Sequence, residues 1–316
     1  MIGLSYCNKG GLASAVKLAR GFSKKITMPV SEFINDRLYA KSEGYFTKKE
    51  TQLGFMDKPI PFPDIFGYED YSKMLHERYP KNAWLTPSEI FKPYYGMTIG
   101  NYIDFIMKQM QSKGTAARGQ QVKIIEVGAG NGSAAVAILN FYKLYRPSSY
   151  KNIQYTIVEI SEPLIKRCKD QLSKQHPQLI ANSQIRFVNS SILDYASVSN
   201  DLTFVILLEV LDNMPHERIY FKEDSEDIEM AMVEIDGDSL KEVRTKTIDI
   251  ETRELFDIWR EVDSMKENYE IADKGDTTVS HCLLILSLLE FTSPLEESSR
   301  RTTYFFPHTP TACSKD

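Results

Sequence analysis

Short apolar runs alternate with amphipathic stretches through the middle of the chain. The runs occupy residues 123–127, 154–158, 184–188 and 203–208, and residues 133–145 and 162–175 between them show helical spacing. Alternating strands and helices are typical of a parallel sheet that helices cover on both faces. We therefore predict an α/β fold in which a ligand binds beyond the carboxyl ends of the strands.

The residues before this region predict a helical N-terminal extension. Residues 29–40 form a short amphipathic helix, residues 58–63 a proline-rich loop, and residues 87–112 one helical run that ends in a polar linker at 112–121. Tyr94, Tyr95 and Tyr102 recur along one face of that run, which indicates packing in the core. In the helix at 162–175, Ser161 is the expected N-cap.

The alternating pattern stops after Pro215. Residues 228–235 and 243–250 flank Asp236 and Gly237 and predict a β-hairpin inserted into the sheet domain. Residues 255–262 predict a helix. Residues 280–291 are apolar, and their pattern is compatible with either a helix or a strand. Residues 304–307 predict a last short strand.

The most informative motif joins the first strand of the sheet to the helix that follows it. Glu126 precedes Gly128, Gly130 and Gly132, and an alanine-rich helix begins at Ser133. Glycine allows the backbone to approach a ligand closely and to adopt positive φ, and the first N–H groups of the helix face that ligand. The motif predicts a nucleotide-cofactor turn, although a turn that only packs tightly would also use glycine.

Three positions favour S-adenosylmethionine over NAD. Glu126 would repel a pyrophosphate but suits the ammonium and sulfonium groups of S-adenosylmethionine. Ser133 stands where a dinucleotide fingerprint has glycine or alanine. Glu159 ends the second strand, where a carboxylate accepts hydrogen bonds from both ribose hydroxyls. An NAD-dependent oxidoreductase is accordingly the disfavoured alternative.

Composition and charge narrow the classes of partner. The chain has 42% hydrophobic and 26% charged residues, the ordinary balance of a globular protein, and the apolar run at 282–289 is too short to span a bilayer. Its four cysteines are scattered, which supports neither a zinc site nor a disulfide framework. The formal net charge of -5 argues against non-specific binding to nucleic acid.

The first 22 residues have the composition of a mitochondrial transit peptide. They contain Lys9, Lys17 and Arg20 among serines, alanines and leucines, and the first acidic residue is Glu32. A basic, acid-free start without a long apolar core favours import into the mitochondrial matrix over secretion, with cleavage expected after Phe22. Cleavage there would take the formal net charge from -5 to -8. A basic start that is merely disordered is the alternative.

Several segments resemble the MidA-like family, whose members are class I S-adenosylmethionine-dependent methyltransferases. The matching segments are residues 28–33 with 44–46, residues 84–91 with Tyr95 and Gly96, the turn 126–132, and residues 208–215. Together they extend over about residues 28–307. The chain departs from the family pattern where serine and proline are exchanged at 87–88, and where Ser133 replaces an arginine and Leu208 an asparagine.

The resemblance implies a Rossmann-like class I methyltransferase fold that uses S-adenosylmethionine, with an N-terminal helical extension and an inserted β-hairpin. The mitochondrial member of the family methylates protein arginine residues and assists the assembly of respiratory complex I. By analogy, we expect a matrix enzyme that acts on a protein substrate, such as a subunit of complex I. We expect a transit peptide at 1–22, a helical or lid region at 23–120, and a methyltransferase domain at 121–316 with an insertion at about 216–300.

The reaction suggests which carboxylates are catalytic. Methyl transfer from a sulfonium is an in-line displacement that needs no metal, and a guanidinium acceptor must be held by carboxylates because it stays protonated. Glu209 and Asp212 follow the fourth strand and are our candidates, with Glu89 as a third; Asp212 could instead cap a helix. Glu209 should be half-buried, and Ser191 and Ile192 should contact the adenine.

The C-terminus departs from the family pattern. After the last strand the family continues with a helix and further strands, whereas this chain ends at Asp316. We therefore expect a sheet truncated at its C-terminal edge and a protein that is marginally stable, dependent on a partner, or inactive. The alternative function is a non-catalytic assembly or binding protein that retains the methyltransferase fold.

Overall fold

The computed structural model describes residues 25–41, 43–48, 53–80, 83–117, 119–195, 201–221, 227–263, 280–284 and 303–305. The chain forms two compact units, one of residues 1–48 with 211–293 and one of residues 49–210 with 294–316. The predicted transit peptide at 1–22 and the end of the chain lie outside the described residues. Among the helices that are described, none combines the length and the apolar character that crossing a bilayer requires.

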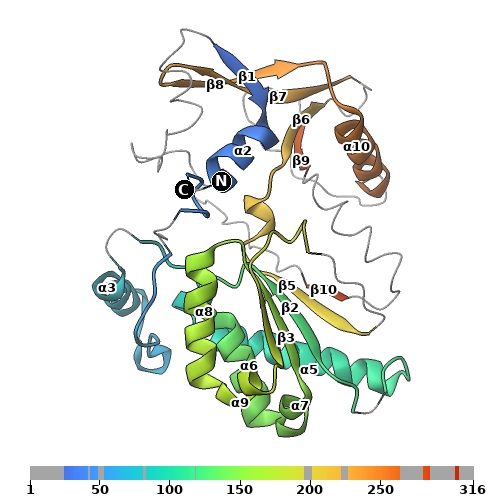
Figure 1. The fold of residues 1–316 in the computed structure, drawn as a ribbon. Helices are drawn as coiled ribbons and strands as arrows, with labels where there is room; N and C mark the ends of the chain where they lie inside the picture. The colour runs from blue at the N-terminus through green and yellow to red at the C-terminus, as the bar shows by residue number, and fades with distance from the viewer. Residues whose placement is uncertain are drawn as a thin grey trace. The chain divides into compact units, whose positions relative to one another are not determined.

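The larger unit contains the predicted parallel sheet, with the strand order β10-β5-β2-β3-β4. Its strands are β2 (Lys123–Val127), β3 (Gln154–Val158), β4 (Ile185–Val188), β5 (Thr203–Leu207) and β10 (Thr303–Phe305). All neighbouring pairs are parallel, and Val127 lies opposite both Val158 and Leu207. Because the central strands end in register, the residues that follow them share one edge of the sheet (Figure 1). The predicted α/β class is confirmed.

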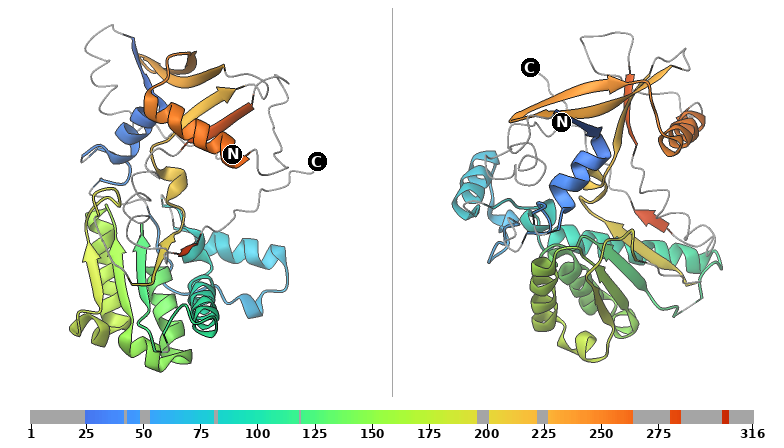
Figure 2. Two further views of the ribbon diagram at one scale, coloured as in Figure 1. Left: turned by 90° about the vertical axis from the view of Figure 1, so that its right-hand side faces the viewer. Right: turned by 45° about the horizontal axis from the view of Figure 1, so that its top comes forward.

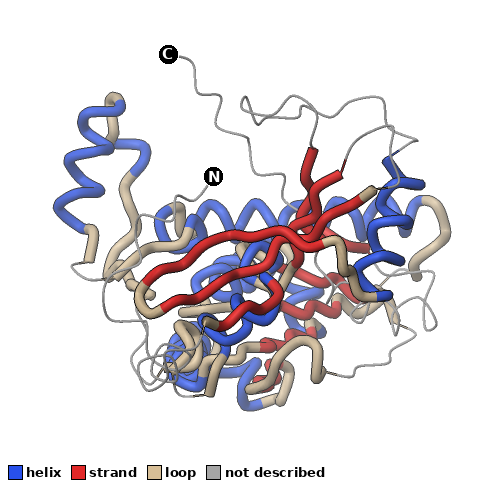
Figure 3. Tube along the Cα trace, turned by 90° about the horizontal axis from the view of Figure 1, so that it is seen from above, coloured by secondary structure: helices blue, strands red, loops and turns tan. Residues whose placement is uncertain are grey.

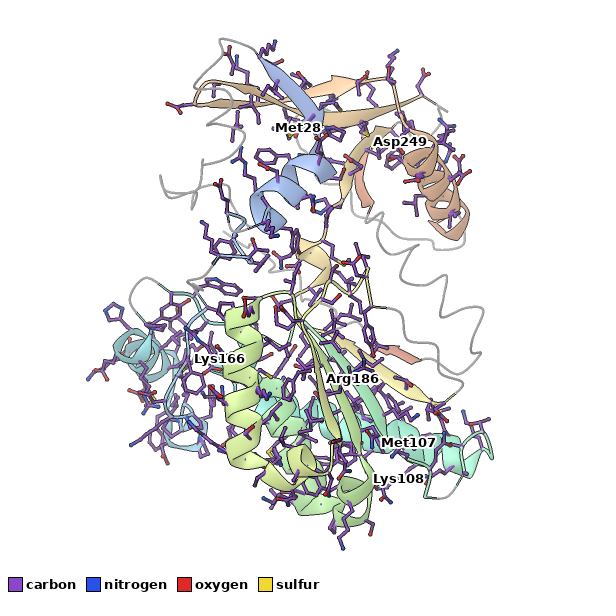
Figure 4. All side chains as sticks on the ribbon, viewed as in Figure 1. Met28, Met107, Lys108, Lys166, Arg186 and Asp249 are labelled. Carbon is purple, nitrogen blue, oxygen red and sulfur yellow. The ribbon has the colours of Figure 1, made fainter. Side chains whose placement is uncertain are left out.

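Helices from the described part of this unit pack around the sheet (Figures 1 and 2). They are α5 (Tyr94–Ser112), α6 (Ser133–Tyr145), α7 (Pro147–Asn152), α8 (Glu162–Gln175) and α9 (Pro177–Ala181). Helix α5 presents one buried face: Met107 is buried, while the adjacent Lys108 is exposed and pairs with Asp104 at 2.8 Å (Figure 4). Gly96 lets α5 approach α6 closely, since a Cβ on this residue would lie 2.6 Å from the Cβ of Ala137.

The N-terminal part of this unit differs from the prediction. The expected single helix over 87–112 is two helices, α4 (Pro87–Ile90) and α5, separated by a turn that contains Pro93. The loop at 58–63 runs into a 3₁₀ turn, η2 (Phe62–Asp64), and the helix α3 (Tyr68–Arg78) was not predicted. Tyr95 packs against the core as expected, but Tyr94 and Tyr102 are 48% and 41% exposed, so the predicted burial of those two was wrong.

The described residues of the smaller unit form an antiparallel sheet and two helices. The strands are β1 (Ile26–Pro29), β6 (Glu217–Phe221), β7 (Ile228–Asp236), β8 (Ser239–Thr245) and β9 (Ser280–Leu284), and the helices are α2 (Val30–Tyr39) and α10 (Ile250–Asp263), with the 3₁₀ turn η3 (Leu211–Asn213). The predicted hairpin is confirmed: β7 and β8 pair around Gly237, which has a φ of 59° (Figure 3). Residues 280–284 form a strand, so the first part of the segment 280–291, for which helix and strand were both possible, is a strand.

Carboxylates hold the starts of both helices in the smaller unit. The N-cap of α2, Pro29, offers no side-chain hydrogen bond, and the buried Glu217 instead accepts the Ser31 N–H at 3.3 Å and the Ser31 hydroxyl. At the start of α10, Asp249 accepts the Thr252 N–H at 2.8 Å (Figure 4). Because α10 begins at Ile250, the predicted strand at 243–250 ends earlier, at Thr245.

Candidate cofactor and acceptor site

The predicted glycine turn has a backbone that needs glycine. Gly128, Gly130 and Gly132 have φ values of 65°, 55° and 82°, in the left-handed region that side chains disfavour. Space is limited as well, because a Cβ on Gly132 would lie 2.6 Å from the Sγ of Cys168 and one on Gly130 would lie 2.9 Å from the side chain of Leu53. The turn therefore brings bare backbone to the carboxyl edge of the sheet and to the start of α6.

Glu126 is a buried carboxylate directly before this turn. Its side chain is 3% exposed, and the Tyr155 hydroxyl donates a hydrogen bond of 2.5 Å to its Oε2. Burial, together with the negative charge of Glu159, raises the pKa of Glu126 to about 7, against the lowering effect of the Tyr155 hydrogen bond. A nearby cation would therefore be needed to keep this group ionised well below neutral pH.

Glu159 is bound to the backbone of the turn. Its Oε2 accepts the Gly130 N–H at 3.0 Å, and its Oε1 accepts the Ser161 N–H at 2.9 Å. Burial raises the pKa of Glu159, although these hydrogen bonds from the backbone oppose the shift. Ser161 is the N-cap residue of α8, but its hydroxyl makes no capping hydrogen bond, which corrects the role predicted for that side chain.

A segment that the sequence analysis left out forms one wall of the turn. The side chain of Leu53 lies against Gly130, and the Asn131 side chain donates to the Gly54 carbonyl at 2.6 Å. From α8, Arg167 donates to the Leu53 carbonyl at 3.2 Å. The sequence signal for this wall was Asn131 inside the glycine motif. A buried amide needs hydrogen-bond partners, and the Asn131 side chain finds one in a segment far away in the chain.

Glu89 lies in a buried network rather than on an open surface. Its Oε1 accepts the Met56 N–H at 2.7 Å and pairs with the Lys92 ammonium at 2.5 Å, and its Oε2 accepts the Ser133 hydroxyl. The side chain of Glu89 is 1% exposed. These contacts link α4 to the start of α6 and favour a structural role for Glu89. The catalytic role predicted from the sequence stays a prediction.

Glu209 lies at the carboxyl end of β5 in an unusual conformation. Its φ is 56°, one of two positive values among the described residues other than glycine. The side chain is exposed, so the half-burial that we expected was wrong. Burial of Tyr95 and the nearby charge of Glu209 together raise the pKa of the Tyr95 hydroxyl, so α5 brings this phenol into the field of Glu209. The sequence analysis assigned Tyr95 only to the core.

The remaining predicted residues are less central. Asp212 is an exposed residue of η3, and the Asn213 side chain donates to its Oδ1 at 3.2 Å. Asp212 belongs to the smaller unit, whereas Glu209 belongs to the larger one. After β4, the Ser191 hydroxyl accepts the Leu193 N–H at 3.2 Å, and Ile192 is buried. Within the described parts of the chain, no three His, Cys, Asp or Glu side chains are grouped so that they could hold a metal ion.

Comparison with known proteins gives the family and supports the fold. The family model described as S-adenosyl-L-methionine-dependent methyltransferase (Methyltransf_28) matches residues 98–283. Among curated proteins, none matches the chain.

Two solved structures from Burkholderia thailandensis resemble the whole chain. One is a COG1565 superfamily member bound to S-adenosyl-homocysteine, with a TM-score of 0.56 and 17% identity. The other is a native structure of a COG1565 superfamily protein, with a TM-score of 0.51 and 18% identity. The matches cover 96% of this chain and 65% of each of those chains, so this chain spans less than two thirds of their length. These findings confirm the class I methyltransferase fold and S-adenosylmethionine as cofactor, and the chain belongs to this family of S-adenosylmethionine-dependent methyltransferases.

Proposed function

We propose that this protein is a mitochondrial methyltransferase that methylates an arginine side chain of a protein substrate, such as a subunit of respiratory complex I. The observation that carries the proposal is Glu209, an exposed carboxylate held with a φ of 56° at the strand end next to the glycine turn. A left-handed conformation costs a non-glycine residue about 1–2 kcal/mol. Such strain is found more often at functional sites than elsewhere, and it supports a role in binding the acceptor.

The residues around the glycine turn fit S-adenosylmethionine. A Cβ at Gly130 or Gly132 would meet the side chain of Leu53 or Cys168, so the turn keeps a bare backbone at the carboxyl edge of the sheet. Buried carboxylates beside it suit a cationic ligand better than a pyrophosphate. Glu126 would hold the cationic amino-acid end, and the Gly130 backbone and Glu159 would hold the ribose. When bound, the cofactor supplies an electrophilic methyl group on its sulfonium.

Glu209 would then orient the acceptor. Its two carboxylate oxygens can accept two parallel N–H bonds from a guanidinium, which fixes the plane of the acceptor and stabilises its charge. After transfer, the same carboxylate can take up the proton that leaves the acceptor nitrogen and pass it to solvent, because the side chain is exposed. The Tyr95 phenol would pack beside the acceptor and exclude water from one side of it.

One observation favours the non-catalytic alternative. Both oxygens of Glu159 already accept N–H groups of the protein, from Gly130 and Ser161, so ribose hydroxyls would have to share or replace these bonds. A protein that retained the fold for assembly or binding alone could keep Glu159 in this self-contained arrangement.

Two measurements separate the functions. Calorimetry should show that S-adenosylmethionine binds the wild type and that Gly130→Val abolishes the binding; absence of binding by the wild type would contradict the enzyme. Transfer of labelled methyl groups to mitochondrial proteins should be lost in Glu209→Gln while its cofactor affinity stays within about twofold. Unchanged transfer would remove the role of Glu209, and cofactor binding without any transfer would favour the alternative.

The mitochondrial location has its own test. A fluorescent protein that carries residues 1–22 of this chain should enter the matrix, and changing Lys9, Lys17 and Arg20 to glutamine should prevent its import. Cytosolic fluorescence from the unchanged fusion would contradict the location.

A further inference from the structure

Five aromatic rings form a continuous series on the larger unit. Neighbouring ring centroids lie 5.5–6.5 Å apart, within the range of favourable aromatic pairs. The series runs from Tyr68 through Tyr71 to Phe62, which contacts both Phe91 and Tyr94. It therefore connects α3, which stands to one side of the sheet in Figures 1 and 2, with the first residue of α5.

Only the inner part of this series is explained by packing. Phe62 and Tyr71 are half-buried against a small core around Met56 and Ile60. The outer end of the series is open to solvent: Tyr68 is 80% exposed, and Phe66, two residues before it in the sequence, is 92% exposed. Exposed aromatic groups that adjoin one another mark interaction sites more often than isolated ones do.

The charged side chains within residues 59–72 are acidic, and Arg78, farther along α3, donates to the Pro59 carbonyl at 2.8 Å. Residues 59–72 contain three carboxylates, Asp64, Glu69 and Asp70, and no Lys or Arg. Lys58 and Lys73 flank this stretch. The Lys92 ammonium is turned inward, where it pairs with Glu89 and lies 4.0 Å from the Phe55 ring centroid. An aromatic surface with carboxylates beside it complements a cation, and arginine in particular, whose planar guanidinium stacks on rings and pairs with carboxylates.

The series also leads to the candidate acceptor site. Its last ring, Tyr94, precedes Tyr95, the residue of α5 that lies in the field of Glu209. The ring series and the candidate acceptor site therefore meet at the start of α5.

We propose that Phe66, Tyr68 and Tyr94, with Asp64 and Glu69, form a docking surface for an arginine-containing segment of the protein substrate. The inference rests on the proposed function, because it names the substrate segment that the same site would receive. Docking at this surface would hold one arginine away from the site while a second arginine of the same segment reaches Glu209.

Peptide binding tests the surface without any turnover. The probe is a fluorescein-labelled peptide in which arginines are spaced by glycine and serine, and its affinity is read by fluorescence polarisation. We expect the double variant Phe66→Ala/Tyr68→Ala to weaken binding about tenfold, and Asp64→Asn/Glu69→Gln to weaken it about threefold to tenfold at low salt and less at high salt. Replacing the arginines of the peptide by glutamine should abolish binding.

The chain offers a matched control. Tyr102 and Phe105 on α5 are 41% and 52% exposed, with ring centroids 6.4 Å apart, and Tyr102→Ala/Phe105→Ala should leave peptide binding unchanged. Equal losses in both aromatic variants, a loss below twofold at Phe66 and Tyr68, or equal affinity for the glutamine peptide would overturn the proposal. So would a variant at Phe66 and Tyr68 that loses binding to phosphatidylglycerol vesicles but keeps the peptide.

Failure of the docking surface can be told apart from failure of the proposed function. Cofactor affinity, measured by calorimetry, should be the same in all these variants because none of the changed residues touches the glycine turn. If the peptide binds as expected but no methyl group is transferred, docking stands and the enzyme does not; if transfer to protein occurs with the same KM in the Phe66 and Tyr68 variant, the enzyme stands and docking does not.

Discussion

The Tyr155 hydroxyl donates to the Oε2 of Glu126 at 2.5 Å, and among the described residues this neutral group is the hydrogen-bond partner of the buried carboxylate before the glycine turn. The pKa of Glu126 is therefore raised to about 7, since burial outweighs this single hydrogen bond. In the proposed site, the cationic end of the cofactor would supply a positive charge beside Glu126. The protonation of Glu126 and the binding of S-adenosylmethionine are then linked.

The first prediction is a dependence of cofactor affinity on pH. S-adenosylmethionine should bind more tightly as the pH rises from 6 to 8, because ionised Glu126 attracts the cation and protonated Glu126 does not. Calorimetry across this range should show the rise in the wild type and a flat, weaker profile in Glu126→Gln. The same rise in both proteins would show that another group is responsible.

Ionisation of Glu126 should strengthen cofactor binding but should lower the stability of the ligand-free protein. Its pKa is higher in the folded protein than the ordinary value of 4.5, so its contribution is fully present below pH 4.5 and is lost as the pH rises through about 7. At pH 8, Glu126→Gln should therefore raise the free energy of unfolding of the ligand-free protein, by an amount on the order of 2–3 kcal/mol. Denaturant titrations at pH 5 and pH 8 measure this, and a variant less stable than the wild type at pH 8 would contradict it.

A buried histidine predicts acid sensitivity. His176 is fully buried, its Nδ1 lies 2.8 Å from the Tyr150 hydroxyl, and burial lowers its pKa from 6.5 to about 4. The folded protein keeps His176 neutral while the unfolded chain takes up a proton below pH 6.5, so this contribution to stability falls between pH 6.5 and 4. In His176→Gln, the free energy of unfolding should depend less on pH across this window, whatever its absolute value. An unchanged dependence would exclude His176 as the source.

Two glycines with positive φ separate backbone strain from steric overlap. Gly132 has a φ of 82° and Cys168 beside it, whereas Gly237 has a φ of 59° and open space around its Cα. Gly237→Ala should cost about 1 kcal/mol from conformation alone, and Gly132→Ala should cost more and also weaken cofactor binding. Thermal unfolding of both variants gives the difference. Equal losses would mean that the turn accommodates a methyl group by shifting.

The buried pair of Glu89 and Lys92 allows a test of whether Glu89 is structural or catalytic. Removing one partner leaves the other charge buried, so Glu89→Gln should destabilise the protein by about 3–5 kcal/mol. The double variant Glu89→Gln/Lys92→Met should recover part of this loss in a denaturant titration. If Glu89→Gln unfolds like the wild type but no longer transfers methyl groups, the catalytic assignment of Glu89 would be right and the structural one wrong.

The sequence predicted best what local patterns specify. Strands β2 and β3 and helices α6 and α8 lie at the predicted bounds, because apolar runs and helical spacing act over neighbouring residues. The break before α5 was missed because Pro93 begins a helix there rather than interrupting one, and both outcomes are compatible with the same pattern.

The candidate site was predicted only in part. The glycine turn and its two carboxylates follow from the motif, whereas the contacts of Leu53, Gly54 and Glu89 with that turn join residues far apart in the chain. The exposure of Glu209 depends on its left-handed backbone, which no neighbouring residue type signals. Long-range packing and backbone strain thus account for what pattern analysis did not find.

The wall that Leu53 and Gly54 build against the glycine turn lies upstream of the segment that identifies the family, residues 98–283. A recombinant fragment beginning at residue 98 would keep the strands of the parallel sheet but would lose the Leu53 side chain that covers Gly130 and the Gly54 carbonyl that accepts from the Asn131 side chain. We therefore expect that a fragment must start before Leu53 if it is to keep the turn covered as it is here.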